Sequence, residues 1–376
     1  MKLLIVLCLV AALAAEDLNS ILRSPVLSLK LYNNFKSGEG LNFRNSGEDR
    51  MRFRLFLNNA QFVASANNEA DDSVTFGLNQ FSTMTDAEKG SYLGINATGI
   101  SAHAPLLQVS DVPVPAEKLW TDGYLVTKVK NQGSCGSCWT FAAVGGLETR
   151  YAVHSGVLKS FAEQEFLDCV YSYRDGCRGG WPGTAYDWSA ANGGRLATAR
   201  NYPYQGYASY SRCGATTKAN GLIAASLARN IDIPAGEANN IQALAAGSVS
   251  MAFEVTSYFY QYAGGILKDP TCTGAINHGV TGVGYTPDYV LVKNSWGKRW
   301  GELGFIKFAR NHGNCRLFDF SSYPQLTDLG VVDTDPKDMY SPYKPRKYTP
   351  QPGPDGSCPN GTIMCPDGKC RHEHMC

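Results

Sequence analysis

The distribution of cysteine is the feature that most limits how this chain of 376 residues can fold. Residues 16–112 contain no cysteine, residues 113–327 contain seven, and the last 24 residues contain four. The remaining one, Cys8, lies in an apolar N-terminal segment, so eleven of the twelve cysteines belong to the rest of the chain. An odd number in a chain that enters an oxidising compartment predicts at least one unpaired thiol. The abrupt change after residue 112 also predicts a leader that is separate from a cysteine-containing domain.

The N-terminus is typical of a secretory signal peptide over residues 1–15. Met1-Lys2 precedes an apolar run that ends at Ala15 and is too short to cross a bilayer. No later segment approaches about 18 uninterrupted apolar residues, so we expect a soluble protein of the secretory pathway, lysosomal or extracellular, with no membrane span. Glycosylation sequons begin at Asn96 and Asn360. A net charge of +1 gives no reason to expect nucleic-acid binding.

The leader contains one clear helical pattern. Six residues recur at offsets of 4, 4, 3, 4 and 4, which places them on one face of a helix: Glu48, Arg52, Phe56, Asn59, Val63 and Asn67. On spacing alone, an ordinary amphipathic helix explains this pattern equally well.

The C-terminal part of the chain divides into a linker and a small tail. Residues 328–354 contain six prolines and few aliphatic residues, which predicts a stiff, extended linker. Residues 355–376 are too few for a hydrophobic core, so we expect two disulfides among Cys358, Cys365, Cys370 and Cys376 to hold them. His372 and His374 leave a metal site as the alternative.

Two cysteines three residues apart, Cys135 and Cys138, lie in a Gly/Ser-rich loop that leads into a predicted helix. The helix runs from Cys138 to His154, because apolar residues return at spacings of three and four and Gly156 follows. A thiol at a helix N-terminus faces unpaired backbone amides and a favourable dipole, and both stabilise its anion. The glycine pair at residues 145–146 weakens the helix unless something packs closely there.

A nucleophilic thiol needs a base, and the central region offers three histidines. His154 lies 16 residues along the same helix, roughly 24 Å from Cys138, and is too far away. His312 lies in a polar loop without an obvious orienting partner. His278 precedes a predicted hairpin in which opposite residue numbers add up to about 572 or 573. Asn294 should therefore face His278 and orient its ring.

Acyl transfer also requires donors for a developing oxyanion. The side chain of Gln132 and the backbone amide of Cys138 can supply two N–H groups. Gln132 lies six residues before the nucleophile, in a loop that allows a substrate to approach the backbone.

With these residues in place, the chain resembles the papain-like cysteine peptidases and is nearest in layout to the cathepsin L group. Motifs shared with that family span much of the chain: residues 131–141, 177–180, 277–279, 294–297 and 300–302.

The resemblance implies an α+β fold of two lobes, one helical and one an antiparallel, barrel-like sheet, with the active site between them. It places the peptidase domain at residues 114–327. It also implies the roles of nucleophile for Cys138, base and then acid for His278, orienter for Asn294, oxyanion donor for Gln132, and hydrophobic shield for Trp296. A His-paired thiol of this family has a pKa of about 3 to 4, which would make Cys138 a thiolate. No metal or cofactor is expected.

The resemblance further implies a set of disulfides and a zymogen. Three disulfides are expected: Cys135 with Cys177, Cys169 with Cys213, and Cys272 with Cys315. Residues 16–113, the leader, would form an inhibitory propeptide that is cut near residues 112–114. The pattern from Glu48 to Asn67 matches the helix of the family's propeptide, and residues 77–81 resemble the second motif of that propeptide. Thr83 stands where the family usually has aspartate, which puts a pH-sensing role of that position in doubt.

Substrate-binding positions also carry over from the family. Gly180 should bind the substrate backbone, and the main specificity pocket should be lined by Trp181, Pro182, Ala252, Ile276 and Phe320. The aromatic residue at the pocket floor predicts a shallow apolar pocket that favours Leu, Val or Pro over Phe. It should exclude Arg, because an unpaired buried guanidinium costs several kcal/mol. No cleft-blocking His-His insertion is present, which indicates an endopeptidase.

The expected partners are protein or peptide substrates, the chain's own leader as inhibitor, and cystatin-like inhibitors, with the enzyme acting as a monomer. The alternative is a non-catalytic homologue with a structural or binding role. The presence of Gln132, Cys138, His278 and Asn294 argues against that alternative.

Overall fold

The computed structural model describes residues 18–70, 73–96, 104–109, 113–171, 175–209, 213, 223–224, 227–269, 271–272, 274–310, 315–327, 363–364 and 370–371. The predicted signal peptide, His312, Asn360 and the predicted linker over 328–354 lie outside these residues. The tail is described only as a two-stranded pair, β12 (Ile363–Met364) with β13 (Cys370–Arg371).

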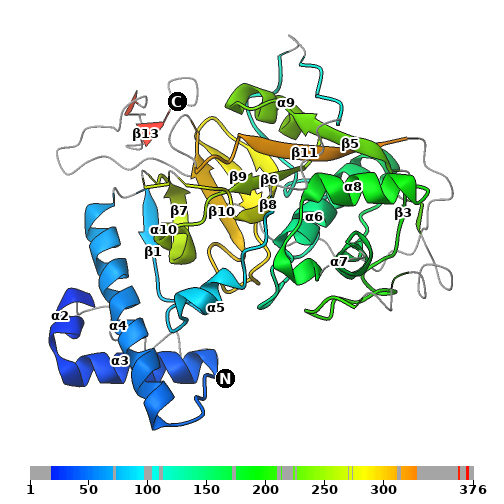
Figure 1. The fold of residues 1–376 in the computed structure, drawn as a ribbon. Coiled ribbons are helices and arrows are strands. Elements are labelled where there is room, and N and C mark those ends of the chain that lie inside the picture. The colour runs from blue at the N-terminus through cyan, green and yellow to red at the C-terminus, as the bar shows by residue number, and fades with distance from the viewer. Residues whose placement is uncertain are drawn as a thin grey trace.

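The N-terminal region is helical: α2 (Leu18–Arg23), α3 (Pro25–Glu39) and α4 (Ser46–Glu69) form a lobe of their own beside the sheet (Figure 1). The Ser24 side chain caps α3 by accepting from the Leu27 amide, and Asn45 caps α4 by accepting from the Gly47 and Glu48 amides. These caps satisfy donors that a helix start leaves unpaired.

The one-sided pattern predicted for the leader lies on α4, and its polar members hold the chain that follows. Asn67 accepts from the Phe76 amide and donates to the Phe76 carbonyl, and Asn59 donates to the Ser82 carbonyl. Phe56 and Val63 from the same face are buried. The helix therefore supports β1 (Val74–Phe76), which extends the edge of the main sheet.

The helical lobe contains α6 (Cys138–Ser155), α7 (Glu163–Cys169) and α8 (Pro182–Ala191), with a short turn, η2 (Gly176–Arg178). Large side chains fill its core, among them Trp139, Leu147, Tyr151, Phe161, Phe166 and Tyr186. The glycine pair in α6 is explained by close packing. A Cβ at Gly145 would lie 2.2 Å from the Thr281 hydroxyl oxygen, and one at Gly146 would lie 2.3 Å from that of Tyr186.

A nine-stranded sheet forms the other lobe. Its main path is β1, β7, β10, β9, β8, β6, β11, β5, and β2 pairs with β8. The strands are β2 (Lys118–Leu119), β5 (Leu227–Ile233), β6 (Val249–Phe253), β7 (Tyr262–Leu267), β8 (His278–Tyr285), β9 (Tyr289–Lys293), β10 (Phe305–Ala309) and β11 (Phe320–Leu326). Two helices, α9 (Glu237–Ala246) and α10 (Ser257–Tyr260), connect strands of this lobe, and a separate pair joins β3 (Arg195–Leu196) to β4 (Ile223–Ala224).

The expectation of an antiparallel sheet is wrong at one pair of strands. β7 and β10 run parallel, with Lys307 opposite Ile266. β8 and β10 run in the same direction, because each is antiparallel to β9. The connection from β7 to β8 is not a hairpin, so β7 can also run in this direction and lie parallel to β10. The remaining pairs of this sheet are antiparallel.

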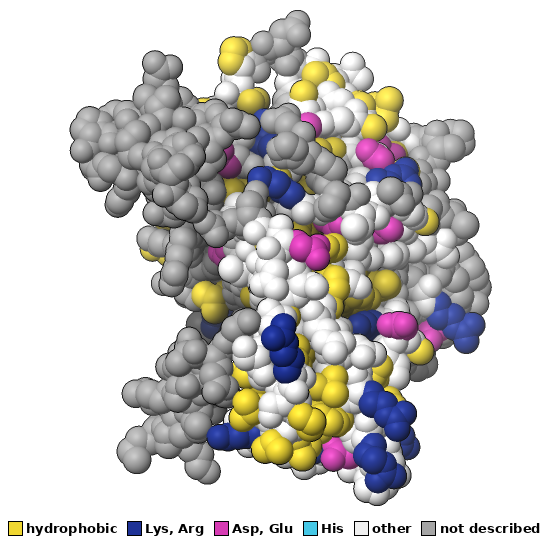
Figure 2. Space-filling model, turned by 90° about the vertical axis from the view of Figure 1, so that its left-hand side faces the viewer, with side chains coloured by type: hydrophobic (Ala, Val, Ile, Leu, Met, Phe, Trp, Pro, Cys, Tyr) yellow, Lys and Arg dark blue, Asp and Glu magenta, His cyan; other side chains and the backbone are white. Residues whose placement is uncertain are grey.

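The leader extends across the molecule by way of the short helix α5 (Asp86–Gly90) and residues 91–96, which pass between the lobes (Figure 1). On the side of the molecule that carries α3 and α4, hydrophobic side chains gather near basic ones (Figure 2). Val26, Leu29 and Met51 are among the exposed large hydrophobic residues. Among the described residues, no helix has both the length and the apolar character that a membrane span requires.

Candidate active site

Among the residues that the structure describes, the unpaired thiol is Cys138, the first residue of α6, and it is fully buried. The structure contains disulfides between Cys135 and Cys177, Cys169 and Cys213, and Cys272 and Cys315, the pairs expected from the resemblance. The first of these bridges ties the loop before Cys138 to η2, so the backbone that leads into α6 is cross-linked to the helical lobe. His154, by contrast, is exposed in the last turn of α6.

His278 begins β8 and lies beside the chain that follows β9. Its Nε2 is 2.8 Å from Oδ1 of Asn294, which is an acceptor, so Nε2 carries the proton and Nδ1 is left for the thiol. The predicted hairpin register is wrong by about two residues, since opposite residue numbers add up to 574 or 575 instead of 572 or 573. Thr281 pairs with Lys293 and Tyr285 with Val290, because the turn is closed between Thr286 and Tyr289 and a bulge lies between Gly282 and Gly284. The two side chains nevertheless meet, because Asn294 reaches His278 from beyond the end of β9.

Trp296 covers this pair from one side. Its ring lies 4.7 Å from the His278 ring and stacks on Tyr260 at 5.4 Å, and the tryptophan is fully buried. Phe81 of the leader packs against the Trp296 ring at 4.6 Å. The hydrogen bond between His278 and Asn294 is therefore shielded from water by aromatic side chains.

Gln132 is held firmly beside the thiol. Its Oε1 accepts from the Ser295 hydroxyl at 2.6 Å, which leaves its amide nitrogen as a donor. Nε2 donates to the carbonyl oxygens of Cys135 and Tyr92, each at 2.9 Å. The second acceptor belongs to the leader and occupies one of the N–H groups proposed for an oxyanion.

The strap, residues 92–96 of the leader, occupies the cleft. The resemblance implies a leader that lies along the cleft, but sequence reasoning did not single out these residues. Gly94 and Ile95 donate their amides to the Asn277 carbonyl, each at 3.1 Å. Asn96 donates to the Gly180 carbonyl at 3.0 Å, and Gly180 donates to the Gly94 carbonyl at 2.9 Å. Ile95 and Gly180 pair in the parallel sense, so the strap forms a short backbone ladder with Gly180, a predicted substrate-binding residue.

Gly94 permits the closest approach of the strap to the enzyme. A Cβ at this position would lie 1.9 Å from the Gly136 carbonyl oxygen. That oxygen cannot move freely, because the Gly136 amide donates to the Cys177 carbonyl at 3.0 Å beside the Cys135–Cys177 disulfide. A glycine between two aliphatic residues, Leu93 and Ile95, is the only local sequence signal of this contact.

Burial keeps the thiol and the imidazole in their neutral forms beneath the strap. It raises the pKa of Cys138 to about 12, although the backbone amides of Gly279 and Gly94 lower it in part. It lowers the pKa of His278 to about 4, although the hydrogen bond that His278 donates to Asn294 raises it in part. In this covered state the thiol therefore differs from the low-pKa thiolate that the resemblance implies, because both groups are fully buried and burial disfavours an ion pair.

The predicted pocket residues lie together beside Gly180. Phe320 begins β11 opposite Ala252 of β6, and its ring stands edge-on to Trp181 at 6.3 Å. Pro182 begins α8 and is buried, and Ile276 is half-buried two residues before His278. Ile95 of the strap lies beside this region, because its Cδ1 would lie 3.1 Å from a Cβ at Gly279, the residue opposite Ala252 in the sheet.

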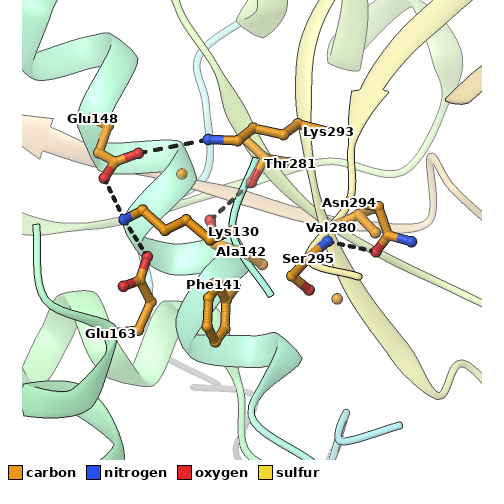
Figure 3. A pocket seen from close by; sticks show the side chains of 12 residues that line it. Lys130, Phe141, Ala142, Glu148, Glu163, Val280, Thr281, Lys293, Asn294 and Ser295 are labelled. Atoms are coloured by element: carbon orange, nitrogen blue, oxygen red, sulfur yellow. Dashed lines mark hydrogen bonds and ion pairs between the residues drawn. The ribbon is translucent and has the colours of Figure 1, made fainter. Parts of the chain in front are cut away.

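A buried ionic network lies behind the site and was also missed by sequence reasoning (Figure 3). Lys130 contacts Glu148 at 2.8 Å and Glu163 at 2.5 Å, while Lys293 lies 3.9 Å from Glu148 and donates to Thr127 at 2.7 Å. Burial opposes the charge on Glu148, but Lys130 and Lys293 outweigh it and hold the pKa of Glu148 below its usual value. Burial lowers the pKa of Lys293 to about 8.

This network joins the two lobes, because Glu148 belongs to α6 and Lys293 ends β9. A cavity of about 20 Å³ lies beside it, large enough for one water molecule, and Asn294 and Ser295 are among its lining residues.

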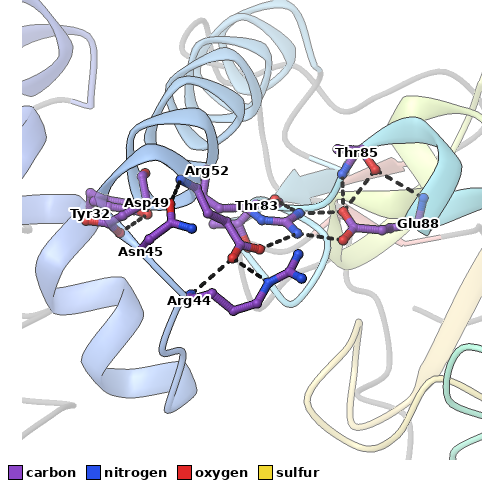
Figure 4. Close-up of polar contacts among 9 residues, drawn as sticks. Tyr32, Arg44, Asn45, Asp49, Arg52, Thr83, Thr85 and Glu88 are labelled. Carbon is purple, nitrogen blue, oxygen red and sulfur yellow. Dashed lines mark hydrogen bonds and ion pairs between the residues drawn. The ribbon is translucent and has the colours of Figure 1, made fainter.

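A second ionic cluster holds the leader together, at the position where Thr83 replaces the usual aspartate (Figure 4). Thr83 contributes only its backbone carbonyl, which accepts from Arg52 at 3.0 Å. Both terminal nitrogens of Arg52 bind the Glu88 carboxylate, and one also lies 3.3 Å from Glu48. The bond from Arg52 lowers the pKa of Glu88 to about 2, so this pair remains charged in mildly acidic solution.

Comparisons with known proteins agree with this geometry. The sequence profile described as papain family cysteine protease matches residues 114–325. The profile described as cathepsin propeptide inhibitor domain matches residues 32–88, within the leader.

Individual relatives match both parts of the chain. Fruit bromelain from Ananas comosus is 34% identical over 313 residues, which cover 79% of this chain and 86% of that protein. Cathepsin L from Sarcophaga peregrina is 34% identical over 342 residues, covering 85% of this chain and 99% of that protein. The solved structure of a recombinant stem bromelain precursor aligns with a TM-score of 0.72 and 32% identity, covering 80% of this chain and 99% of that one.

Proposed function

Because this chain belongs to the papain family of cysteine proteases and carries an inhibitory propeptide domain, we propose that Cys138, His278, Asn294 and Gln132 together hydrolyse peptide bonds once the leader is removed. One observation carries this assignment. A buried, unpaired thiol begins a helix in the same cleft as an imidazole whose Nε2 is 2.8 Å from an asparagine oxygen. Nucleophile, base and orienter are the three groups that covalent catalysis by a thiol requires.

In the proposed reaction, Nδ1 of His278 takes the proton from the Cys138 thiol, and Sγ attacks the carbonyl carbon of the scissile bond. The resulting oxyanion accepts hydrogen bonds from Gln132 Nε2 and from the Cys138 backbone amide. His278 then gives its proton to the leaving amine, which departs and leaves a thioester on Cys138. Water, deprotonated by His278, hydrolyses the thioester and restores the thiol.

The strap would block this reaction by occupying the groups that bind substrate. Its Tyr92 carbonyl accepts from Gln132, and its Ile95 backbone lies along Gly180. We propose that the leader, residues 16–113, is cut away near residues 112–114. The Arg52–Glu88 pair holds the leader together beside Thr83, and it remains charged in mildly acidic solution.

The pocket formed around Phe320 supports a preference for a small aliphatic residue next to the residue that is cut. Ile95 of the strap lies beside this region, and a branched aliphatic side chain therefore fits there. The aromatic ring at the floor offers no partner for a guanidinium, so Arg should be excluded. We further propose a secreted or lysosomal monomer that acts on proteins or peptides and is open to cystatin-like inhibitors, with Asn96 and Asn360 as glycosylation sites.

The test uses labelling and hydrolysis after acid processing of the full chain under mild reduction. We expect a thiol-directed epoxide to label the processed enzyme and to stop its hydrolysis of peptides. Cys138→Ala should remove both labelling and hydrolysis, while His154→Ala, which alters an exposed histidine on the same helix, should preserve both. If the processed wild-type chain showed no labelling and no hydrolysis, this result would favour the non-catalytic alternative.

A further inference from the structure

The loop before β11 carries two consecutive non-glycine residues in the left-handed conformation, Cys315 with φ of 54° and Arg316 with φ of 66°. Residues with a side chain are strained there and persist only when their surroundings hold them. Cys315 is held by its disulfide to Cys272, and its carbonyl accepts from the Glu254 amide at 2.9 Å. No covalent bond holds the side chain of Arg316, so its contacts must explain its conformation.

The side chain of Arg316 reaches three groups around the proposed pocket. Its guanidinium carbon lies 5.0 Å from the centre of the Phe320 ring. Its Nε donates to Asp319 Oδ2 at 2.9 Å, and its Nη1 donates to the Gly274 carbonyl at 3.4 Å. Gly274 lies two residues before Ile276, another predicted pocket residue. Arg316 therefore joins the pocket floor to one of its walls.

Phe320 needs such a contact to stay in place. It is half-buried at the start of β11, where Trp181 meets its ring edge-on at 6.3 Å. A planar guanidinium stacked on an aromatic face restricts that ring more than a flexible ammonium group would. The charge of Arg316 is balanced by Asp319, and the Gly274 amide on the other side of the contact donates to Oε2 of Glu254 at 2.6 Å. Its effect on the pocket is therefore geometric.

We propose that Arg316 is a positioning residue for substrate specificity: by stacking on Phe320 and bonding to Gly274, it holds the ring across the floor of the pocket and keeps the pocket shallow. The inference rests on the proposed function, since it assumes that Phe320 lines the site for the residue next to the one cut. The left-handed strain at Arg316 is the structural cost of placing this side chain over the ring.

The experiment compares peptide substrates that carry Val, Leu or Phe at that position, using enzyme processed from the full chain. Arg316→Gly removes the guanidinium and relieves the left-handed strain, because glycine accepts a φ of 66°. We expect the ratio of kcat/KM for Phe to that for Val to rise at least fivefold, mainly through KM. Arg316→Lys, which lacks the planar group, should give an intermediate ratio. Arg229→Ala, a change at an exposed arginine on β5, should not alter it.

Further variants and measurements separate the outcomes. Phe320→Ala should raise the same ratio without Arg316 being changed. A purely structural role would lower the melting temperature of Arg316→Gly and leave the ratio unaltered, which would overturn the inference. An unaltered ratio in both Arg316→Gly and Arg316→Lys would overturn it even if one variant folds poorly. Failure of the wild-type enzyme to cleave any of the three peptides would instead contradict the proposed function.

Discussion

At the scale of single residues, the state of His278 links the fold to pH. Its folded pKa of about 4 lies below the ordinary value of 6.5, because burial disfavours the imidazolium. Between these two values the unfolded chain binds more protons than the folded one. The contribution of His278 to the free energy of unfolding is therefore fully present above pH 6.5. It decreases as the pH falls and is lost below pH 4.

We predict that this histidine makes the zymogen about 3 kcal/mol less stable at pH 4 than at pH 7. Urea unfolding should be measured at both pH values on Cys138→Ala, which prevents processing, and on Cys138→Ala with His278→Gln. The double variant should lack this part of the pH dependence. The interpretation would be contradicted by the same loss of stability in both proteins.

At the scale of elements, the strap inhibits through backbone contacts that only a glycine permits. Gly94 passes so close to the Gly136 carbonyl that an added Cβ would overlap it, and this carbonyl belongs to a cross-linked loop. Overpacking of such a contact typically costs about 1–3 kcal/mol, which shifts the equilibrium toward an open strap by roughly 5- to 150-fold.

Gly94→Ala should therefore expose the thiol of the unprocessed zymogen. We expect iodoacetamide to alkylate Cys138 at least about fivefold faster in this variant at neutral pH. Gly90→Ala is the matched control, because a Cβ at Gly90 would meet no atom within 4 Å. Equal alkylation rates for wild type, Gly90→Ala and Gly94→Ala would show that the strap tolerates the added methyl group.

At the scale of the whole molecule, the two lobes share a buried network of four charges. Glu148 on the helical side has Lys130 at 2.8 Å and Lys293 at 3.9 Å, and it is fully buried. Removal of Glu148 leaves Lys293 buried without the carboxylate that it faces, while Lys130 keeps its pair with Glu163, and a buried charge without its partner is more costly than the loss of an exposed pair.

We predict that Glu148→Ala lowers the free energy of unfolding of the catalytic domain by about 3–5 kcal/mol. Glu237→Ala, which breaks the partly exposed pair of Glu237 with Arg310 at 2.7 Å, should cost about 1 kcal/mol or less. Urea unfolding of both variants in the Cys138→Ala background makes the comparison. If both substitutions cost the same amount, the network does not stabilise the junction between the lobes.

Much of this architecture was predictable because it rests on local chemistry. The prediction of at least one unpaired thiol depends only on the odd number of cysteines. The helix that begins at Cys138 and the one-sided pattern on α4 depend on spacing within one element. Spacing along one element sets which side chains share a face, and neither tertiary packing nor distant contacts enter that inference.

Only the tertiary structure decided the rest, because those features require segments far apart in sequence to meet. A bulge alters the register of the hairpin between β8 and β9. Gly94 lies against the Gly136 carbonyl, and Lys130 forms ion pairs with Glu148 and Glu163. The pKa values of Cys138 and His278 were likewise set by a strap more than 40 residues before the thiol, since that segment excludes water from the cleft. The residues present and their order along each element determined the chemistry available to this protein, while packing across the cleft determined that it is held inactive.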